Sequence, residues 1–395
     1  MIKLIKSAFY KERETKKALC EFIKSDRRLT FGTECEKFEK NFAQYQKRKH
    51  CIFFNSGSSA NLAIIQALLN LEKIKKGDNA GFSAVTWATN VMPLLQLGLN
   101  PVPIDVELDT LNVSSKKLTD SLKEFPLKIL FLTNLLGFCD DIDKIKEICE
   151  ERNILLIEDN CESLGTIYKG QKLGNFSIAS TFSFYVGHHL STIEGGAVCT
   201  DDDDIAFMLK IVRAHGWDRN LSEAKQSELR NAFGVQSNFY NKYTFYDLGY
   251  NLRPTEISGF LGNIQLQYIN EIIQERNDNF MKLALSIYSQ ADIYYPIRFN
   301  HIDFLSNFAV PVICKSSAIK NETVRKCEGR VEIRPVVGGN ITRQPFFQKY
   351  TSASFGKILP GSNAQLIHEK GFYFGNNPEL TEEEIAQIIH VFTNR

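Results

Sequence analysis

The sequence lacks a long apolar run, an excess of charge of either sign, and any regular spacing of cysteines. No apolar stretch approaches the ~20 residues that a membrane-spanning helix needs, and residues 1–6 are too few and too polar for a targeting region. The 47 Lys and Arg nearly balance the 46 Asp and Glu, which leaves a net charge of +1. No overall basic field therefore favours nucleic acid or a membrane surface as a partner. We expect a cytoplasmic protein.

The nine cysteines are scattered, and none forms a Cys-x-x-Cys pair or a His/Cys cluster with zinc spacing. We expect free, mostly buried thiols in a reducing compartment, and no metal site. The length of 395 residues, with 43% hydrophobic and 24% charged residues, is typical of a globular protein with two or three structural units.

Short apolar runs alternate with helical patterns over the first two-thirds of the chain. We expect strands at 51–54, 128–133, 154–159 and 179–184, with helices at 58–71 and 141–153. This alternation predicts an α/β fold whose mostly parallel sheet is covered by helices on both faces. Ligands bind such sheets at the carboxyl ends of the strands.

The pattern changes near residue 255. Residues 256–291 read as one long or broken helix, strand candidates follow at 308–314 and 329–333, and Thr381 is the expected N-cap of a closing helix. We expect a large domain over residues 1–254, which includes an N-terminal helical segment. A smaller α/β domain is expected over residues 255–395.

Residues 55–59, Asn-Ser-Gly-Ser-Ser, lie between an expected strand and an expected helix. Gly57 would allow an unusual backbone angle, and the hydroxyl of Ser58 would add a donor to the free amides of the first helical turn. Such a turn binds phosphate through these amides and the helix dipole, although Ser-Gly-Ser is also common in ordinary turns.

Two further side chains suggest a bound aromatic ring. Asp159 ends a buried strand, where its carboxylate needs a cation or hydrogen-bond donors. A protonated pyridinium nitrogen is one such partner, and a helix cap or loop hydrogen bond is the alternative. Trp87 follows a strand-like run, where its indole would either stack on a flat ring or fill the core.

The segment from Ser183 to Gly196 resembles the active-site segment of the DegT/DnrJ/EryC1/StrS family. These nucleotide-sugar enzymes use pyridoxal 5′-phosphate (PLP) on the type I aminotransferase fold, and their segment reads Ser-Phe-x-x-x-Lys followed by Gly-Glu-Gly-Gly or Gly-Asp-Gly-Gly. An ungapped alignment places His188 where the family has its lysine. The resemblance continues through residues 103–106, 157–165, 214–220, 249–256 and 344–347.

The resemblance implies a PLP-dependent transferase fold of type I and a role for each matching residue. Gly57, Ser58 and Ser183 would hold the cofactor phosphate, Trp87 would stack on the ring, and Asp159 would pair with the pyridinium nitrogen. Asn251 would reach the phosphate of a neighbouring subunit, which implies a homodimer with shared active sites. Glu162 occupies a position where aminotransferases often carry glutamine, and its contact stays open. His215, Arg219 and Arg253 would bind the substrate or the carboxylates of glutamate, or else form surface ion pairs.

Histidine in place of lysine changes the expected reaction. An imidazole moves protons near neutral pH but cannot form the Schiff base that anchors the cofactor. This substitution marks the family's sugar 3-dehydratase branch, so the resemblance implies a PLP/pyridoxamine 5′-phosphate (PMP) enzyme of dideoxysugar biosynthesis. It would remove the 3-hydroxyl of a nucleotide-linked 4-keto-6-deoxyhexose, with GDP-4-keto-6-deoxy-D-mannose as the expected substrate. The products would be a 4-keto-3,6-dideoxy sugar and ammonia.

Several alternatives stay open. His189 competes with His188 for the catalytic role. A related branch draws electrons from an iron–sulfur cluster bound by cysteines after the His-Gly element, but residues 216–245 contain no cysteine. We therefore expect L-glutamate as the amino donor and no iron–sulfur cluster. The rival functions are an aminotransferase that uses another lysine and a non-catalytic protein that binds PLP or a nucleotide sugar.

Overall fold

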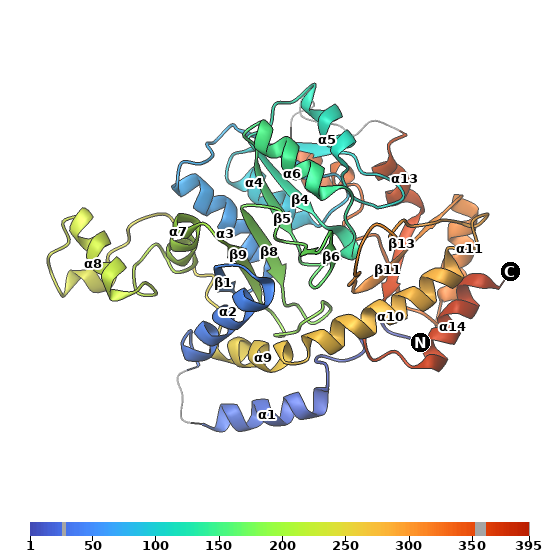
Figure 1. The fold of residues 1–395 in the computed structure, drawn as a ribbon, viewed down its shortest axis with the longest axis horizontal. Helices are drawn as coiled ribbons and strands as arrows, with labels where there is room; N and C mark the ends of the chain where they lie inside the picture. The colour runs from blue at the N-terminus through green and yellow to red at the C-terminus, as the bar shows by residue number, and fades with distance from the viewer. Residues whose placement is uncertain (26–28, 352–360, 395) are drawn as a thin grey trace.

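The computed structural model describes residues 1–25, 29–351 and 361–394. A seven-stranded sheet forms the centre of the molecule, and a four-stranded sheet lies beside it toward both chain termini (Figure 1). Within these ranges, no helix is both long and apolar enough to cross a bilayer.

The large sheet is mostly parallel, as the sequence predicts. Its strands, in spatial order, are β1 (His50–Phe54), β9 (Gly196–Thr200), β8 (Ala179–Ser183), β5 (Leu155–Asp159), β4 (Ile129–Thr133), β2 (Asn79–Ser83) and β3 (Asn100–Ile104). Only β9 runs against its neighbours. It does so because residues 184–195 join β8 to β9 as a hairpin loop, without the helix that a parallel crossover uses.

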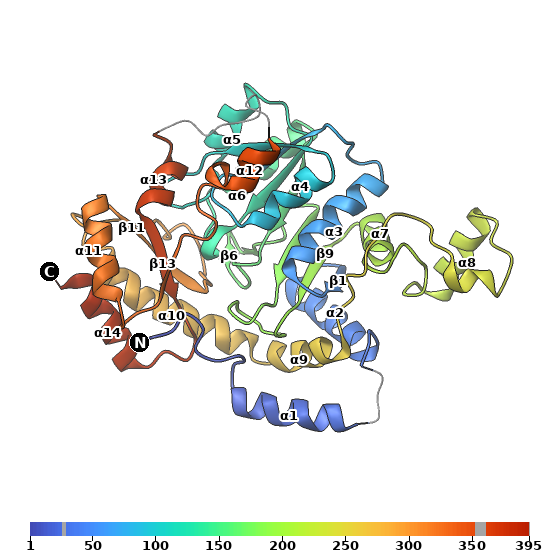
Figure 2. The same cartoon turned by 180° about the vertical axis from the view of Figure 1, so that it is seen from behind.

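Helices cover both faces of this sheet. The helices of the first part of the chain are α1 (Glu12–Lys24), α2 (Thr33–Gln46), α3 (Gly57–Asn70), α4 (Met92–Gln96), α5 (Ser115–Leu122), α6 (Ile142–Glu151), α7 (Asp203–Arg213) and α8 (Glu223–Ala232). Helix α6 lies over one face (Figure 1), and α3 and α4 lie over the other (Figure 2). All five residues of β4 are buried, as expected of a strand covered on both faces. Helix α8 projects away from the body and buries none of its residues.

The small sheet is antiparallel throughout. Its order is β10 (Tyr294–Tyr295), β11 (Ala309–Cys314), β13 (Gly371–Gly375) and β12 (Ile333–Pro335), and a separate short hairpin comprises β6 (Ile167–Tyr168) and β7 (Gln171–Lys172). The later helices are α9 (Glu256–Leu266), α10 (Ile269–Ile287), α11 (Ser317–Cys327), α12 (Pro345–Tyr350), α13 (Asn363–Lys370) and α14 (Glu382–Thr393).

Most of the expected elements are confirmed, and one strand is wrong. The helix expected over 256–291 is the broken pair α9 and α10, and Thr381 caps α14 in a reciprocal capping box with Glu384. The strand expected at 329–333 begins only at Ile333. A turn that contains Gly329 with a φ of 70° follows α11 instead, and Val331 forms a single bridge to Ile2.

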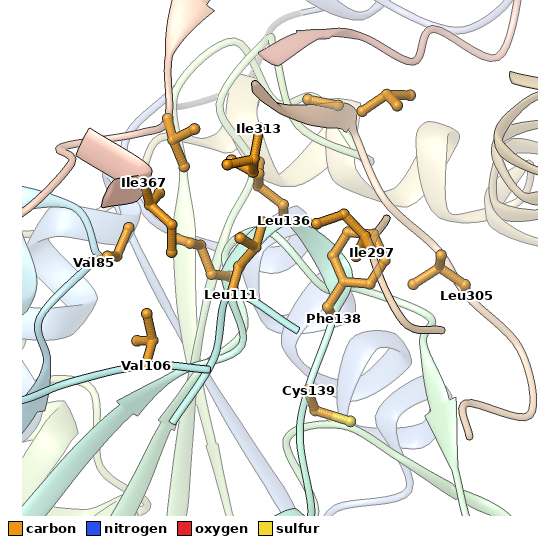
Figure 3. Packing of buried hydrophobic residues seen from close by; sticks show 14 of the residues in the cluster. Val85, Val106, Leu111, Leu136, Phe138, Cys139, Ile297, Leu305, Ile313 and Ile367 are labelled. Atoms are coloured by element: carbon orange, nitrogen blue, oxygen red, sulfur yellow. The ribbon is translucent and has the colours of Figure 1, made fainter. Parts of the chain in front are cut away.

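A continuous apolar core joins the two sheets. Val85 and Val106, from loops at the end of the large sheet, lie in one cluster with Ile313 of β11 and Ile367 of α13 (Figure 3). The first residues of the chain also lie beside the segment that precedes β12, through the bridge between Ile2 and Val331. The domain boundary at residue 255 stays a prediction.

Candidate active site

A cavity of about 300 Å³ opens at the carboxyl ends of the large sheet's strands, where ligands bind α/β sheets. Its walls come from the turn after β1, the ends of β4, β5 and β8, the β8–β9 loop, and residues near the small sheet. Among its lining residues are seven that the sequence singles out: Gly57, Ser58, Trp87, Asp159, Glu162, Ser183 and His188.

The turn between β1 and α3 forms one end of the cavity. Ser56 is the N-cap of α3, since its Oγ accepts a hydrogen bond from the Ser59 amide at 3.0 Å. Gly57 does not have the unusual backbone angle that we expected, because its φ is not positive. Glycine is required there for space: a Cβ on Gly57 would lie 2.7 Å from the Cβ of Ser183. Ser183 at the end of β8 therefore lies directly against the N-terminus of α3.

Asp159 is held by three donors. Its Oδ2 accepts from the side-chain amides of Asn61 at 3.0 Å and Asn90 at 2.8 Å, and its Oδ1 accepts from the Cys161 amide at 2.9 Å. Both asparagines are almost completely buried. Our sequence analysis missed them, although an asparagine on the apolar face of the 58–71 helix was a usable signal. The carboxylate is fixed in orientation at the cavity wall.

Trp87 is not a core residue. Its side chain is 54% exposed although it lines the cavity, and it immediately precedes a short 3₁₀ turn that carries Asn90. The indole is therefore available to a flat ligand, as the stacking interpretation requires.

The structure answers what Glu162 contacts. Its Oε2 accepts a hydrogen bond from the amide of Leu136 at 2.7 Å, and Leu136 has a left-handed φ of 53°. Burial raises the pKa of Glu162 to about 8, with the charge of Asp159 and the Leu136 amide as lesser influences in opposite directions. At neutral pH this side chain is therefore mostly a neutral carboxylic acid.

His188 lies in the β8–β9 loop and lines the cavity. Its backbone amide donates to the Tyr185 carbonyl at 2.9 Å, its carbonyl accepts from Nη2 of Arg276 at 3.1 Å, and its ring packs 5.1 Å from Phe308. Burial, followed by the charge of Arg276, lowers the pKa of His188 to about 4. The imidazole is thus neutral near pH 7: it keeps a lone pair that can accept a proton, but it is less basic than an ordinary histidine. His189 is buried and is absent from the residues that line this cavity.

Four expected site residues lie outside the cavity and gather around Trp217. The ring of His215 lies 4.9 Å from that of Trp217, and the guanidinium groups of Arg219 and Arg253 lie 4.2 and 5.4 Å from it. The fourth, Asn251, accepts from Nε of Arg253 at 3.0 Å. These residues form a second group, which we call the Trp217 cluster.

The sequence model of the DegT/DnrJ/EryC1/StrS aminotransferase family matches residues 10–393. The chain belongs to this family. A GDP-4-keto-6-deoxy-D-mannose 3-dehydratase from Yersinia pseudotuberculosis is 34% identical over 372 residues, which cover 92% of this chain and 91% of the relative. The type I fold that the resemblance implies is confirmed.

Two solved structures are also similar over almost their whole length. A GDP-4-keto-6-deoxymannose 3-dehydratase with a trapped PLP–glutamate geminal diamine has a TM-score of 0.89 and 30% identity, with 99% of this chain and 100% of that chain covered. A histidine-to-asparagine variant with bound GDP-perosamine has a TM-score of 0.88 and 29% identity, with the same coverage.

Proposed function

We propose that this protein is a PLP/PMP-dependent 3-dehydratase of a nucleotide-linked 4-keto-6-deoxyhexose, with GDP-4-keto-6-deoxy-D-mannose as its substrate and L-glutamate as its amino donor. The proposal depends mainly on one observation: His188 and Asp159 line the same cavity of an aminotransferase fold. Among the described residues, the cavity lining includes no lysine. The similar enzymes whose names specify this reaction support the choice of substrate.

The residues present fit the cofactor. Gly57 and Ser58 at the start of α3, together with Ser183, offer amides and hydroxyls to a phosphate. Asp159 is an oriented acceptor for a ring N–H, and Trp87 offers an exposed indole face. The group would be held by these contacts alone. When bound, it supplies an electron sink that allows the sugar to lose its 3-hydroxyl.

The proposed task of His188 is to carry protons. A neutral imidazole takes a proton from a carbon acid and returns it to a neighbouring atom, and general acid–base help of this kind contributes roughly 10²–10⁴-fold. A lysine at this place would add a covalent anchor. The overall reaction balances: the sugar loses one oxygen atom, and glutamate becomes 2-oxoglutarate and ammonia. No iron–sulfur protein is needed.

The decisive experiment is incubation of the purified protein with PLP, L-glutamate and a panel of GDP-, CDP- and dTDP-linked 4-keto-6-deoxy sugars. We expect a product that lacks one oxygen atom, with equal amounts of ammonia and 2-oxoglutarate and with the GDP sugar as the best substrate. A 4-amino sugar as the only product would instead support an aminotransferase. Failure of every sugar to lose its 3-hydroxyl would refute the proposal.

Borohydride reduction of the holoenzyme separates the rival functions. A dehydratase with an unanchored cofactor yields no pyridoxyl-lysine peptide, whereas an aminotransferase that uses another lysine yields one. A protein that binds PLP but forms no 2-oxoglutarate from glutamate would be a binding protein rather than an enzyme.

We further propose a homodimer in which the Trp217 cluster serves the partner's cavity. The cluster lies outside the cavity of its own chain, and in the segment that follows α8 the side chains of Phe239 and Tyr240 are more than 70% exposed. In this arrangement Asn251 contacts the cofactor phosphate, and Arg219, Arg253 and His215 contact the substrate or glutamate. Free thiols favour a cytoplasmic location.

Mixing two inactive variants tests the shared site. His188→Asn removes the proton carrier and Asn251→Asp places a charge against the phosphate. If the sites are shared, each mixed dimer contains one site with both defects and one intact site. After co-expression, a mixed dimer should therefore have up to half of the activity of a wild-type dimer. No recovery in verified mixed dimers would show that Asn251 serves the cavity of its own chain rather than that of the partner.

A further inference from the structure

A second, much smaller cavity lies behind His188. Its volume is about 20 Å³, and most of its lining residues come from the N-terminal segment 4–10, the β8–β9 loop and α10. His188 lines both this space and the large cavity, whereas His189 and Arg276 line only the small one. We call this space, bounded by His188, His189 and Arg276, the rear pocket.

Three side chains that line the rear pocket have buried nitrogen atoms that lack a hydrogen-bond partner within the described part of the chain. These atoms are Nδ1 of His188, both ring nitrogens of His189, and Nε of Arg276. His189 and Arg276 are each only 4% exposed. A buried polar group without a partner destabilises the fold, so four such atoms on three neighbouring side chains indicate a small polar ligand between them.

The size of the pocket selects the ligand. A space of about 10–15 Å³ in this measure accommodates one water molecule, which needs two to four polar partners. The volume of the rear pocket is therefore large enough for one water molecule but too small for two. Arg276 is already fixed, because its Nη1 and Nη2 donate to the carbonyls of Asn376 and His188. Nε is the one nitrogen of this guanidinium that has no hydrogen-bond partner among the described residues.

We propose that the rear pocket binds one water molecule, which fixes the tautomer of His188. The water oxygen accepts from Nε–H of Arg276 and from Nδ1–H of His188, and one water proton is donated to a ring nitrogen of His189. His188 Nε2, which is not among the buried nitrogens without a partner, then carries the lone pair toward the large cavity. His189 and Arg276 are positioning residues in this scheme, which rests on the proposed role of His188.

The charges around the pocket agree with this assignment. Arg276 is the only charged side chain among its described lining residues, and the remaining titratable group, Tyr10, directs its hydroxyl to Glu271 at 3.4 Å. Burial and the charge of Arg276 lower the pKa of both histidines, against a smaller opposite effect of the Ser183 backbone on His188 and of the Ser306 backbone on His189. Both imidazoles are therefore neutral, so each has one donor and one acceptor nitrogen, as the network requires.

A fixed tautomer matters because an imidazole, unlike an amine, has two inequivalent nitrogens. With the proton on Nε2, His188 would present a donor where the reaction needs an acceptor. The side chain of lysine has a single nitrogen, so a lysine at this position would have no tautomer to fix. The water would therefore compensate for the exchange of lysine for histidine at this position.

The test uses the PLP-loaded protein with ¹⁵N-labelled histidine. NMR of the wild type is expected to show His188 as the Nδ1–H tautomer, and a crystal structure is expected to show a water within hydrogen-bond distance of the three side chains. In His189→Leu the acceptor is lost, so we expect a mixture of tautomers and about a tenfold fall in kcat with little change in KM. His189→Gln, whose amide oxygen accepts from the water, should restore most of both signals.

His301→Gln is the control for a histidine replacement outside the rear pocket, since His301 packs against Tyr168 and bonds to the Cys139 carbonyl. Thermal unfolding of each variant shows whether a changed NMR signal or kcat comes from an unfolded protein or from a changed His188 tautomer. An unchanged His188 tautomer in a folded His189→Leu protein, or a rear pocket without water in a well-ordered crystal, would overturn the proposal. Neither readout depends on sugar turnover, so a wrong substrate assignment would not obscure the result.

Discussion

Glu162→Gln is expected to remove a large pH dependence from the stability of the cofactor-free protein. The wild-type carboxyl has a pKa raised from 4.5 to about 8 in the folded chain, mainly by burial. Between these values the folded state binds a proton that the unfolded state does not, so folding stability falls as pH rises. Glutamine has the same shape and does not titrate, and its amide oxygen still accepts from the Leu136 amide.

The expected magnitude follows from this pKa shift. Each pH unit within the window costs about 1.4 kcal/mol, and integration from pH 5 to pH 9 gives a loss of up to about 4 kcal/mol for the wild type relative to the variant. Most of the loss falls between pH 5 and pH 8, and the two curves run parallel above pH 9.

Denaturant unfolding of both proteins at a series of pH values measures this difference. Glu162→Ala is the matched control, since it removes the charge and also the acceptor for Leu136, and we expect it to be less stable than Glu162→Gln at every pH. Parallel stability curves for wild type and Glu162→Gln from pH 5 to pH 9 would show that Glu162 ionises normally and that our assignment of a buried neutral acid is mistaken.

Four further substitutions test other parts of the site and fold. Asn90→Ala removes a donor to Asp159 and should weaken PLP binding about tenfold, measured by absorbance titration; unchanged binding would contradict the orienting role. Gly57→Ala forces a Cβ against Ser183 and should cost about 1–3 kcal/mol in unfolding free energy as well as PLP affinity. Thr381→Ala breaks the α14 capping box and should cost about 1 kcal/mol without an effect on kcat. His188→Lys should give a lysine adduct after borohydride treatment and shift the product toward a 4-amino sugar, and the absence of an adduct would place residue 188 away from the cofactor.

The sequence predicts the sheet and the identity of the cavity residues well, because both depend on local signals. Buried strands such as 128–133 are continuous apolar runs, and Gly57, Asp159 and His188 belong to motifs of fixed spacing. The partners of those residues were not predictable in the same way. Asn61 and Asn90 contact Asp159 across about 100 and 70 positions of sequence, and Arg276 approaches His188 from α10. Such contacts are set by how elements far apart in the sequence pack against one another.

The carboxyl of Glu162 shows how a residue that departs from the family's glutamine can preserve its chemistry. A protonated carboxyl and an amide are both neutral, and each combines an acceptor oxygen with a donor. Because burial and the neighbouring Asp159 raise the pKa of Glu162 to about 8, Asp159 at neutral pH would face the cofactor ring without a second negative charge at position 162. Above pH 8 this equivalence ends, since Glu162 becomes a second negative charge that a glutamine never supplies. We therefore expect activity to decline on the alkaline side in the wild type and to persist there in Glu162→Gln, and a wild-type decline that the variant shares would assign it to another group.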